Sequence, residues 1–423
     1  MSRALIWIDE ESRAAAAGCS YLGLTVVERL LRNLRARGVE EAVIGGQQTV
    51  SLPRDLEGFA RYEGAGLSEL LGGLSSKGEP VLVLAGDVVC HPQLMARLLE
   101  RLEAGEPFVV AAEDEGYPIV VATSEAWRDI TSAEHAPESL AELMVHFRDA
   151  PREELVSQYS AEEHGALFSV PMAGDGPIRA RKLLLKLNWR PHDGIVAGAI
   201  NKHISVPISA AIVGTGITPN GLTAAAFVIA LVGIYLTSLG TYTMFLLGAA
   251  LVQVQSILDG CDGEIARLRY LSSRFGAWFD TVVDDVIGVL WVVAASVGSY
   301  HMTGESAWLW VAAIGGGVYF LSLAFVYTTL IIARAEGHQD FVWFFEVGSV
   351  PKQDAPDRRK ISTWLKYAMR RDFYVLFFFL LSIVGLLPVV AGLSATAALG
   401  WFSVTVVQAA KCGLSVNCGS RSG

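Results

Sequence analysis

The chain has 423 residues, of which 52% are hydrophobic and only 18% are charged. Its mean hydropathy of +0.41 is too high for a wholly soluble protein, and this composition also excludes a disordered or fibrous chain. Residues 1–177 contain 14 Lys and Arg against 29 Asp and Glu, whereas the rest contains 19 against 14. An acidic part therefore precedes an apolar part with basic flanks, and no basic stripe indicates nucleic-acid binding.

The first 175 residues are expected to form a doubly wound α/β domain. Two segments, 25–38 and 92–105, place apolar residues at helical spacing and end at a glycine. Short apolar runs, typical of buried parallel strands, lie at 4–8, 42–45, 81–85, 108–112 and 118–123. Strands that alternate with helices in this way favour a doubly wound sheet.

The cysteines and the N-terminus carry information about the compartment. The five cysteines are scattered and odd in number, which predicts neither a disulfide framework nor a zinc site. The opening stretch ALIWIDEESR is too short and turns acidic too soon for a secretory signal peptide. We therefore expect a protein of a reducing compartment.

The remainder of the chain is expected to enter a membrane. Residues 178–203 mix Lys and Arg with Leu, Ile and Trp, which is typical of an amphipathic helix on an anionic membrane surface. We take 178–217 as an amphipathic juxtamembrane segment, 218–412 as an all-α six-helix transmembrane domain and 413–423 as a tail. The six spans, each near the length that a bilayer requires, are predicted at 219–239, 241–261, 279–299, 307–332, 373–392 and 394–411.

The basic residues of the connections predict the orientation of these spans. The connections at 239–241, 300–306 and 392–394 contain no Lys or Arg. The alternate connections contain many, from Arg267 to Arg274 and from Arg334 to Arg371. Because basic loops stay on the cytoplasmic side, we expect a multi-pass protein of the cytoplasmic (inner) membrane with both termini in the cytoplasm.

Four carboxylates at membrane depth mark the candidate site, because such groups are costly there and signal function. Asp259 and Asp262 are three residues apart at the end of the second span, and Asp280 and Asp284 are four apart near the start of the third. The short turn between the spans makes them antiparallel neighbours, so all four can converge. Converging carboxylates require cations, and hard oxygen ligands favour two Mg²⁺ or Mn²⁺ ions.

Two glycines and an arginine fit the same interpretation. Gly263 and Gly276 would let a ligand or a metal-bound phosphate approach the helix backbone closely. Arg267 lies one turn after Gly263, and its guanidinium suits a phosphate group. The segment therefore contains residues that are suited to binding a diphosphate.

The segment resembles the signature of the CDP-alcohol phosphotransferases, which are six-helix integral membrane enzymes. The pattern D-x2-D-G-x2-A-R-x8-G-x3-D-x3-D is complete, from Asp259 through Ala266 to Asp284, and the resemblance extends over about residues 190–412. It implies metal-dependent transfer of a substituted phosphate from a CDP-linked alcohol to an acceptor hydroxyl, with release of CMP. Relatives of this family suggest a homodimer.

The resemblance also implies roles for single residues. It makes Asp259, Asp262 and Asp280 metal ligands, and Asp284 the general base and a further metal contact. Asp285 is outside the signature and turned about 100° from Asp284, so we take it as a helix-face or supporting residue. The positions that would hold CDP are Gly263, Arg267, Ser273, Thr218, Pro219 and Asn220. For the last three, capping of the first span is an equally good explanation.

The substrate is narrowed by a second, less specific resemblance. The stretches 192–209, 263–276 and 370–374 are similar to the fused inositol-phosphate enzymes that make di-myo-inositol phosphate from CDP-inositol. Their anionic acceptor would suit basic residues at the cavity, and the candidates are Arg334, Lys360, Arg370 and Arg371. These residues also satisfy the positive-inside rule alone. The alternative is a CDP-diacylglycerol donor and a phospholipid product.

The N-terminal part resembles sugar nucleotidyltransferases in residues 23–46 and 81–89, where Asp87 matches a metal-binding aspartate. Active members need a Gly-rich loop followed by Arg and Lys after the first strand. Residues 8–23 lack that pattern and contain three acids that would repel a triphosphate. We therefore expect a domain without cytidylyltransferase activity. The alternatives are a bifunctional enzyme that also makes the CDP-alcohol, and a carboxylate-gated ion carrier without chemistry.

Overall fold

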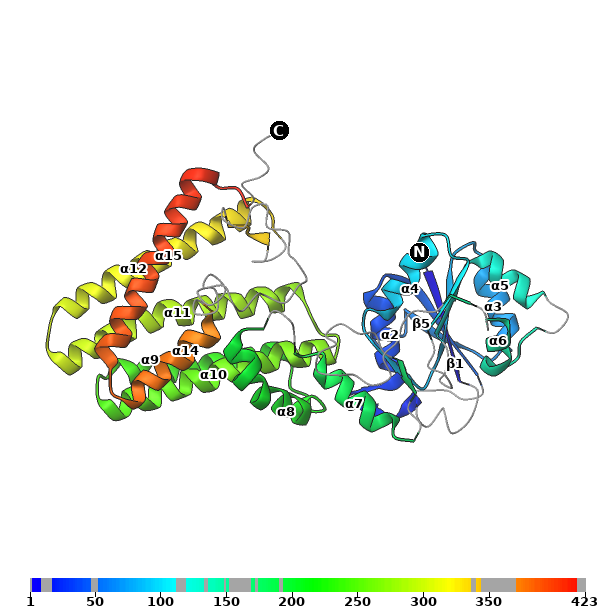
Figure 1. The fold of residues 1–423 in the computed structure, drawn as a ribbon, viewed down its shortest axis with the longest axis horizontal. Helices are drawn as coiled ribbons and strands as arrows, with labels where there is room; N and C mark the ends of the chain where they lie inside the picture. The colour runs from blue at the N-terminus through cyan, green and yellow to red at the C-terminus, as the bar shows by residue number, and fades with distance from the viewer. Residues whose placement is uncertain are drawn as a thin grey trace. The chain divides into compact units, whose positions relative to one another are not determined.

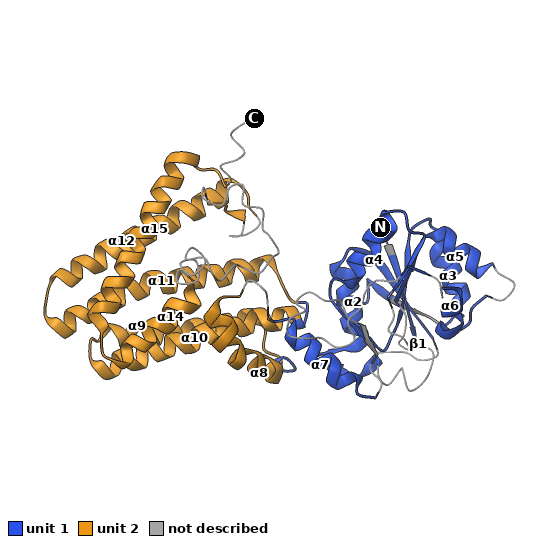
Figure 2. Cartoon of the chain, in the orientation of Figure 1, with its two compact units in different colours: residues 1–188, 213–215, 268–270 blue, residues 189–212, 216–267, 271–423 orange. Residues whose placement is uncertain are grey.

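The chain divides into two compact units (Figures 1 and 2). Unit 1 comprises residues 1–188, 213–215 and 268–270, and unit 2 comprises residues 189–212, 216–267 and 271–423. This computed structural model describes residues 2–8, 17–46, 52–111, 119–132, 136–147, 150–151, 169–171, 174–189, 193–335, 340–343 and 370–416.

Unit 1 is built on a six-stranded mixed sheet with the order β5-β4-β1-β6-β9-β8. The central strand β1 pairs in parallel with β4 and β6, so that Leu5 lies opposite Val43 and Val83. All three side chains are fully buried, as their hydrophobic runs predict. The six strands are β1 Ser2–Ile8, β4 Val39–Gly46, β5 Ala60–Glu63, β6 Val81–Ala85, β8 Phe108–Ala111 and β9 Ile119–Ala122.

Helices cover both faces of this sheet, α2 and α4 on one side and α3, α5 and α6 on the other (Figure 1). Thr25 and Thr123 begin α2 and α5 by accepting hydrogen bonds from Glu28 N and Ala126 N. The helices of unit 1 are α2 Val26–Ala36, α3 Leu67–Ser75, α4 Leu94–Glu103, α5 Ser124–Thr131, α6 Leu140–His146 and α7 Gly176–Lys186. Two small antiparallel pairs complete the unit, β2 Ser20–Tyr21 with β3 Leu24–Thr25 and β7 Val88–Cys90 with β10 Ser169–Pro171.

The expectation that all strands of the sheet are parallel is wrong at β9. This strand runs antiparallel to both of its neighbours, β6 and β8. Only residues 112–118 separate β8 from β9. A parallel connection needs a crossover of a dozen or more residues, so the short link forces the two strands into an antiparallel pair.

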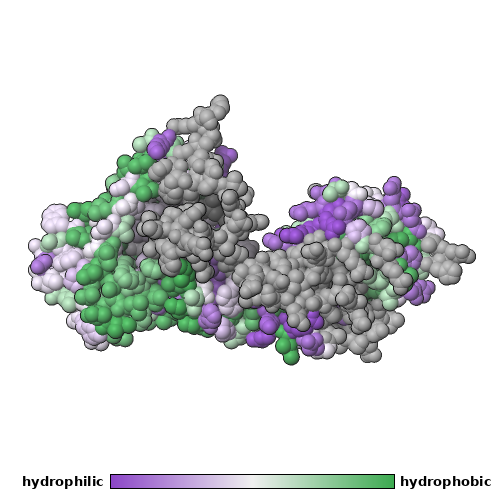
Figure 3. All heavy atoms as spheres, viewed as in Figure 1, coloured by the Kyte–Doolittle hydropathy of each residue, from purple (hydrophilic) through white to green (hydrophobic). Residues whose placement is uncertain are grey.

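Unit 2 is helical, and five of its described helices are long and apolar enough to cross a membrane. Hydrophobic residues gather on its outer surface over these helices (Figure 3), as expected of a multi-pass membrane protein. The five are α9 Pro219–Ser238, α10 Tyr242–Leu268, α11 Arg274–Thr303, α12 Ala307–Ile332 and α15 Leu387–Cys412. The first four confirm the first four predicted spans.

The last two spans were predicted with the wrong boundary. Helix α14 covers only Arg371–Ile383, 13 residues, and α15 begins at Leu387. Gly385 between them has a φ of +77°, a conformation that ends a helix and favours glycine. The predicted loop at 392–394 therefore lies inside α15, although the true connection at 384–386 also lacks basic residues.

Two further expectations need correction. The basic segment 178–203 is not one helix, because α7 ends at Lys186 and Pro191 follows. A π-helical turn, η1 at Ala197–Asn201, then leads into α8 at Lys202–Ile212. The sequence predicted no disulfide framework, but Cys412 is in a disulfide, whereas Cys19, Cys90 and Cys261 are free.

Candidate metal and phosphate site

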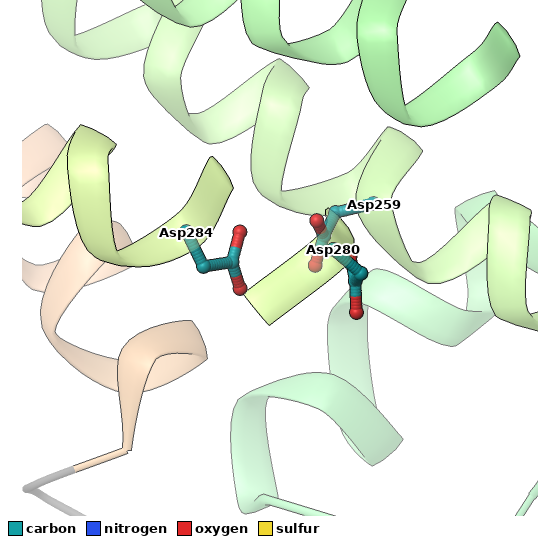
Figure 4. Close-up of side chains that lie close together, drawn as sticks. All are labelled: Asp259, Asp280 and Asp284. Carbon is teal, nitrogen blue, oxygen red and sulfur yellow. The ribbon is translucent and has the colours of Figure 1, made fainter. Parts of the chain in front are cut away.

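Three of the four predicted carboxylates meet between α10 and α11. Asp259 lies near the C-terminal end of α10, whereas Asp280 and Asp284 lie one turn apart near the start of α11. One ligand oxygen from each residue lies within 4.8 Å of the others. Figure 4 shows the three side chains converging from the two helices. The antiparallel arrangement predicted from the short connecting turn therefore brings these groups together.

The oxygens of this three-aspartate cluster fit a divalent cation. The Oδ1 atoms of Asp259, Asp280 and Asp284 are buried without a hydrogen-bond partner. A buried carboxylate oxygen without a partner is costly, and a bound cation would supply the missing partner. Hard carboxylate donors are the ligands that Mg²⁺ and Mn²⁺ prefer.

Asp262, the fourth predicted carboxylate, is outside this group of three. It is 6% exposed, and its Oδ2 accepts a hydrogen bond from the hydroxyl of Thr223 on α9. The sequence did not single out Thr223, whose only signal is its place one turn after the TPN segment. The hydrogen bond fixes the orientation of Asp262 and ties α9 to the end of α10.

The TPN segment at the start of α9 lies beside the start of α11. Thr218 caps α9 by accepting a hydrogen bond from Gly221 N at 3.1 Å, and Ser273 caps α11 by accepting one from Gly276 N at 3.0 Å. A Cβ atom on Gly276 would lie 2.9 Å from Asn220 Oδ1. Gly276 is therefore needed for the approach of the Asn220 side chain, and the segment does more than begin a helix.

Gly263 and Arg267 form a pair on α10. A Cβ atom on Gly263 would lie 3.1 Å from Arg267 Nη1, so the glycine leaves room for the guanidinium one turn later. Glu264, between them, is buried and accepts hydrogen bonds of 2.7 Å from Ser205 and Ser209 of α8. These two bonds hold α8 against the segment that carries the signature.

The four basic residues predicted to bind the acceptor differ in their position relative to the three-aspartate cluster. Arg371, the first residue of α14, forms ion pairs with Asp259 and Asp284. Arg370 lies 3.4 Å from Asp372 and is exposed, and Arg334 is exposed after the end of α12. Lys360 is outside the described residues. Of the predicted acceptor residues that the structure describes, Arg371 is the one in contact with the three-aspartate cluster.

A cavity of about 530 Å³ adjoins the cluster. Its polar end includes Asp280, Asp284, Arg371 and two tyrosines that the sequence did not mark, Tyr319 and Tyr374. Its walls farther along α11 and α14 are largely apolar and include a stacked pair, Trp291 and Phe378, whose ring centroids are 6.1 Å apart. The cavity could therefore hold a substrate next to the carboxylates.

Two contacts from α12 shape this cavity. A Cβ atom on Gly288 would lie 2.7 Å from Tyr319 Oη, so the glycine one turn after Asp284 admits the tyrosine. Asp285, which we expected to support the site, accepts a hydrogen bond of 2.6 Å from Tyr327 and is outside the group of three.

Gln255 is a further residue of the site that the sequence analysis did not identify. It lies one turn before Asp259 on α10 and accepts a hydrogen bond from Arg371. Its four-residue spacing from Asp259 could have marked it.

In unit 1, Asp87 lies in the turn between β6 and β7 and is 2% exposed. Among the residues that the structure describes, no group of three metal-ligating side chains includes Asp87.

Comparison with known proteins identifies the domain that carries the three-aspartate cluster. Residues 216–409 match the family model described as CDP-alcohol phosphatidyltransferase. This part of the chain is a CDP-alcohol phosphatidyltransferase domain, which confirms the resemblance seen in the signature.

Curated relatives and solved structures extend the comparison. Two proteins named "Bifunctional IPC transferase and DIPP synthase" are similar to this chain. The one from Aquifex aeolicus is 33% identical over 138 residues, 32% of this chain and 31% of its own length, so less than a third of that relative is matched. The one from Rubrobacter xylanophilus is 28% identical over 320 residues, 66% of this chain and 71% of its own length. A structure of 4-diphosphocytidyl-2C-methyl-D-erythritol synthase from Anaerococcus prevotii covers 44% of this chain and 98% of its own, with 14% identity and a TM-score of 0.29.

Proposed function

We propose that the CDP-alcohol phosphatidyltransferase domain transfers a substituted phosphate from a CDP-linked alcohol to an acceptor hydroxyl and releases CMP. The observation that carries this proposal is the convergence of Asp259, Asp280 and Asp284, each with a buried oxygen that has no hydrogen-bond partner, next to a cavity that Asp280 and Asp284 line. A salt-bridged helix pair alone would not leave three such oxygens unsatisfied.

In this proposal, two divalent ions, Mg²⁺ or Mn²⁺, are held by Asp259, Asp262, Asp280 and Asp284. When bound, the ions supply positive charge to the diphosphate and to the departing CMP. Asp262 would take part through the oxygen that Thr223 does not engage. Arg267 would hold the diphosphate, while Gly263, Ser273, Thr218, Pro219 and Asn220 would line the CDP subsite.

Asp284 would act as the general base. Its carboxylate removes the proton of the acceptor hydroxyl, and the oxygen then attacks the β-phosphorus of the CDP-alcohol. The bond between that phosphorus and the bridging oxygen breaks, and CMP leaves with the electron pair. Arg267 stabilises the negative charge that gathers on the phosphoryl oxygens.

We further propose an inositol-phosphate substrate, on the basis of the names of the two relatives. Arg371 would meet an anionic group of the acceptor at the polar end of the cavity. The protein would act as a homodimer. The basic connections indicate that both termini lie in the cytoplasm and that the three-aspartate cluster lies at the cytoplasmic rim of the bilayer.

The test of the proposed function is CMP release by the full chain in detergent. We expect release from at least one member of a panel of CDP-alcohols, loss of release after treatment with EDTA, and recovery on addition of Mg²⁺ or Mn²⁺. Mass spectrometry of the product would separate a water-soluble phosphodiester from a lipid. If no CDP-alcohol yields CMP with either ion, while vesicles containing the protein conduct ions, the chain is an ion carrier.

We expect unit 1 to lack cytidylyltransferase activity, because residues 8–23 lack the Gly-rich and basic pattern that would hold a triphosphate. The full chain, incubated with CTP, Mg²⁺ and inositol 1-phosphate, should release no pyrophosphate above the background without enzyme. Asp284→Asn, which alters unit 2 alone, is a useful comparison. Release of pyrophosphate by both proteins would instead establish a bifunctional enzyme.

A further inference from the structure

Arg371 lies where a cation of the proposed metal site would take its ligands. Its Nη1 atom contacts Asp284 Oδ2 and lies 3.2 Å from Asp259 Oδ2. Its Nη2 atom donates a hydrogen bond of 2.5 Å to the fully buried Gln255. The guanidinium thus bridges α10 and α11 and neutralises part of the charge of two of the three clustered aspartates.

The start of α14 is held so that Arg371 reaches this position. Asp372, the next residue, accepts a hydrogen bond of 2.8 Å from the backbone N–H of Ala197 in the π-helical turn η1. Gly194 lies so close to the Asp372 and Arg370 side chains that a Cβ atom there would collide with both. Residues of the stretches 193–209 and 370–374, far apart in sequence, therefore contact each other beside Arg371, and we call this contact the clamp.

A salt bridge between Asp193 and Lys202 holds the part of the clamp that surrounds η1. Lys202 Nζ lies 2.5 Å from Asp193 Oδ2, and both side chains are largely buried. The bond joins the residue before Gly194 to the residue that follows η1. The backbone that donates to Asp372 is thereby fixed on both sides, which restricts where the Arg371 side chain can point.

We propose that Arg371 is a built-in counter-cation of the three-aspartate cluster, which holds Asp259 and Asp284 until a divalent ion displaces it, and that Asp372 is the residue that positions it. The proposal rests on the proposed function, because it assumes that the cluster binds metal. Arg371 and the ion require the same carboxylates and repel each other, so they compete. Displacement would free the guanidinium for an anionic substrate group.

Metal binding by the full chain in detergent, without substrate, tests this competition. The probe is Mn²⁺, and the readout is the free Mn²⁺ signal in electron paramagnetic resonance. We expect Arg371→Gln to bind Mn²⁺ about tenfold more tightly than the wild type, because the competing charge is gone. Arg371→Lys should stay near the wild type, since it keeps the charge. Asp372→Asn should lie between the two, since it loosens the clamp.

Thermal unfolding provides a second readout. In EDTA, Arg371→Gln should unfold at a lower temperature than the wild type, because Asp259 and Asp284 lose their neutralising charge. Saturating Mn²⁺ should then raise its unfolding temperature by more than that of the wild type. Arg128→Gln, the same change in α5 of unit 1, should leave both measurements unchanged.

The outcomes separate this proposal from the proposed function. If the wild type binds Mn²⁺ and releases CMP, but Arg371→Gln binds Mn²⁺ with unchanged or weaker affinity, the counter-cation role is wrong and the enzyme assignment stands. If the wild type and all variants fail to bind Mn²⁺, the metal site itself is wrong and both proposals fall. Should Arg371→Gln not fold, Asp372→Asn decides the question: it should bind Mn²⁺ more tightly than the wild type, and an unchanged or weaker affinity would refute the counter-cation role.

Discussion

Replacing Asp284 by asparagine is expected to lower the rate of CMP release by about 10³-fold or more. Asparagine keeps the shape of the side chain but cannot take a proton, and loss of a positioned base alone costs about 10²–10⁴-fold. Asp284 also supplies one of the three oxygens of the cluster, so its loss should weaken metal binding too. The rate is measured by chromatographic quantification of CMP at saturating Mg²⁺.

The neighbouring residue offers a matched control for this experiment. Asp285→Asn is the same chemical change one position later, where the carboxylate accepts a hydrogen bond from Tyr327 and is outside the group of three. We expect less than about a tenfold loss there, since one hydrogen bond is weakened rather than removed. An Asp284→Asn protein that retains more than a tenth of the wild-type rate would refute the general-base role.

Replacing Gly248 by valine is expected to destabilise unit 2 by about 2–3 kcal/mol. Gly248 of α10 lies against α9, and a Cβ atom there would be 2.5 Å from the carbonyl oxygen of Gly233. The converse also holds, because a Cβ atom on Gly233 would be 2.7 Å from the carbonyl oxygen of Gly248. The two glycines let the helix backbones touch, as small residues do between membrane helices, and a valine must force them apart.

The measurement is the thermal unfolding temperature of the full chain in detergent, together with its elution as a single species. Gly317→Val on α12 is the matched control, because a Cβ atom there meets nothing within 4 Å. Any Gly248→Val protein that does fold should also release CMP more slowly, since α10 carries Asp259 and small displacements of reacting groups are costly. Equal unfolding temperatures for the two valine variants would show that the close crossing does not support the fold.

Much of this protein follows from local sequence patterns. The span predicted at 307–332 coincides with α12, and the strand predicted at 81–85 coincides with β6. The spacings within 259–284 predicted that carboxylates from α10 and α11 would meet, and Asp259, Asp280 and Asp284 do. These successes share a cause: hydrophobic periodicity and residue spacing act within one element or across one short turn.

Other features depended on which distant segments pack together. Three hydrogen bonds or ion pairs join Arg371 to residues 87 to 116 positions away in α10 and α11, and Asp372 meets Ala197 across 175 positions. Two adjacent arginines at 370–371 are expected both in a cytoplasmic loop and beside an acidic site. The sequence therefore does not show which of the two situations applies to Arg371. Sequence alone determined the elements, the membrane-spanning character and the signature carboxylates. Only the tertiary structure decided that Arg371 enters the cluster and that Asp262 is held by Thr223, because side-chain contacts between separate helices depend on how their backbones pack, and no local period encodes that packing.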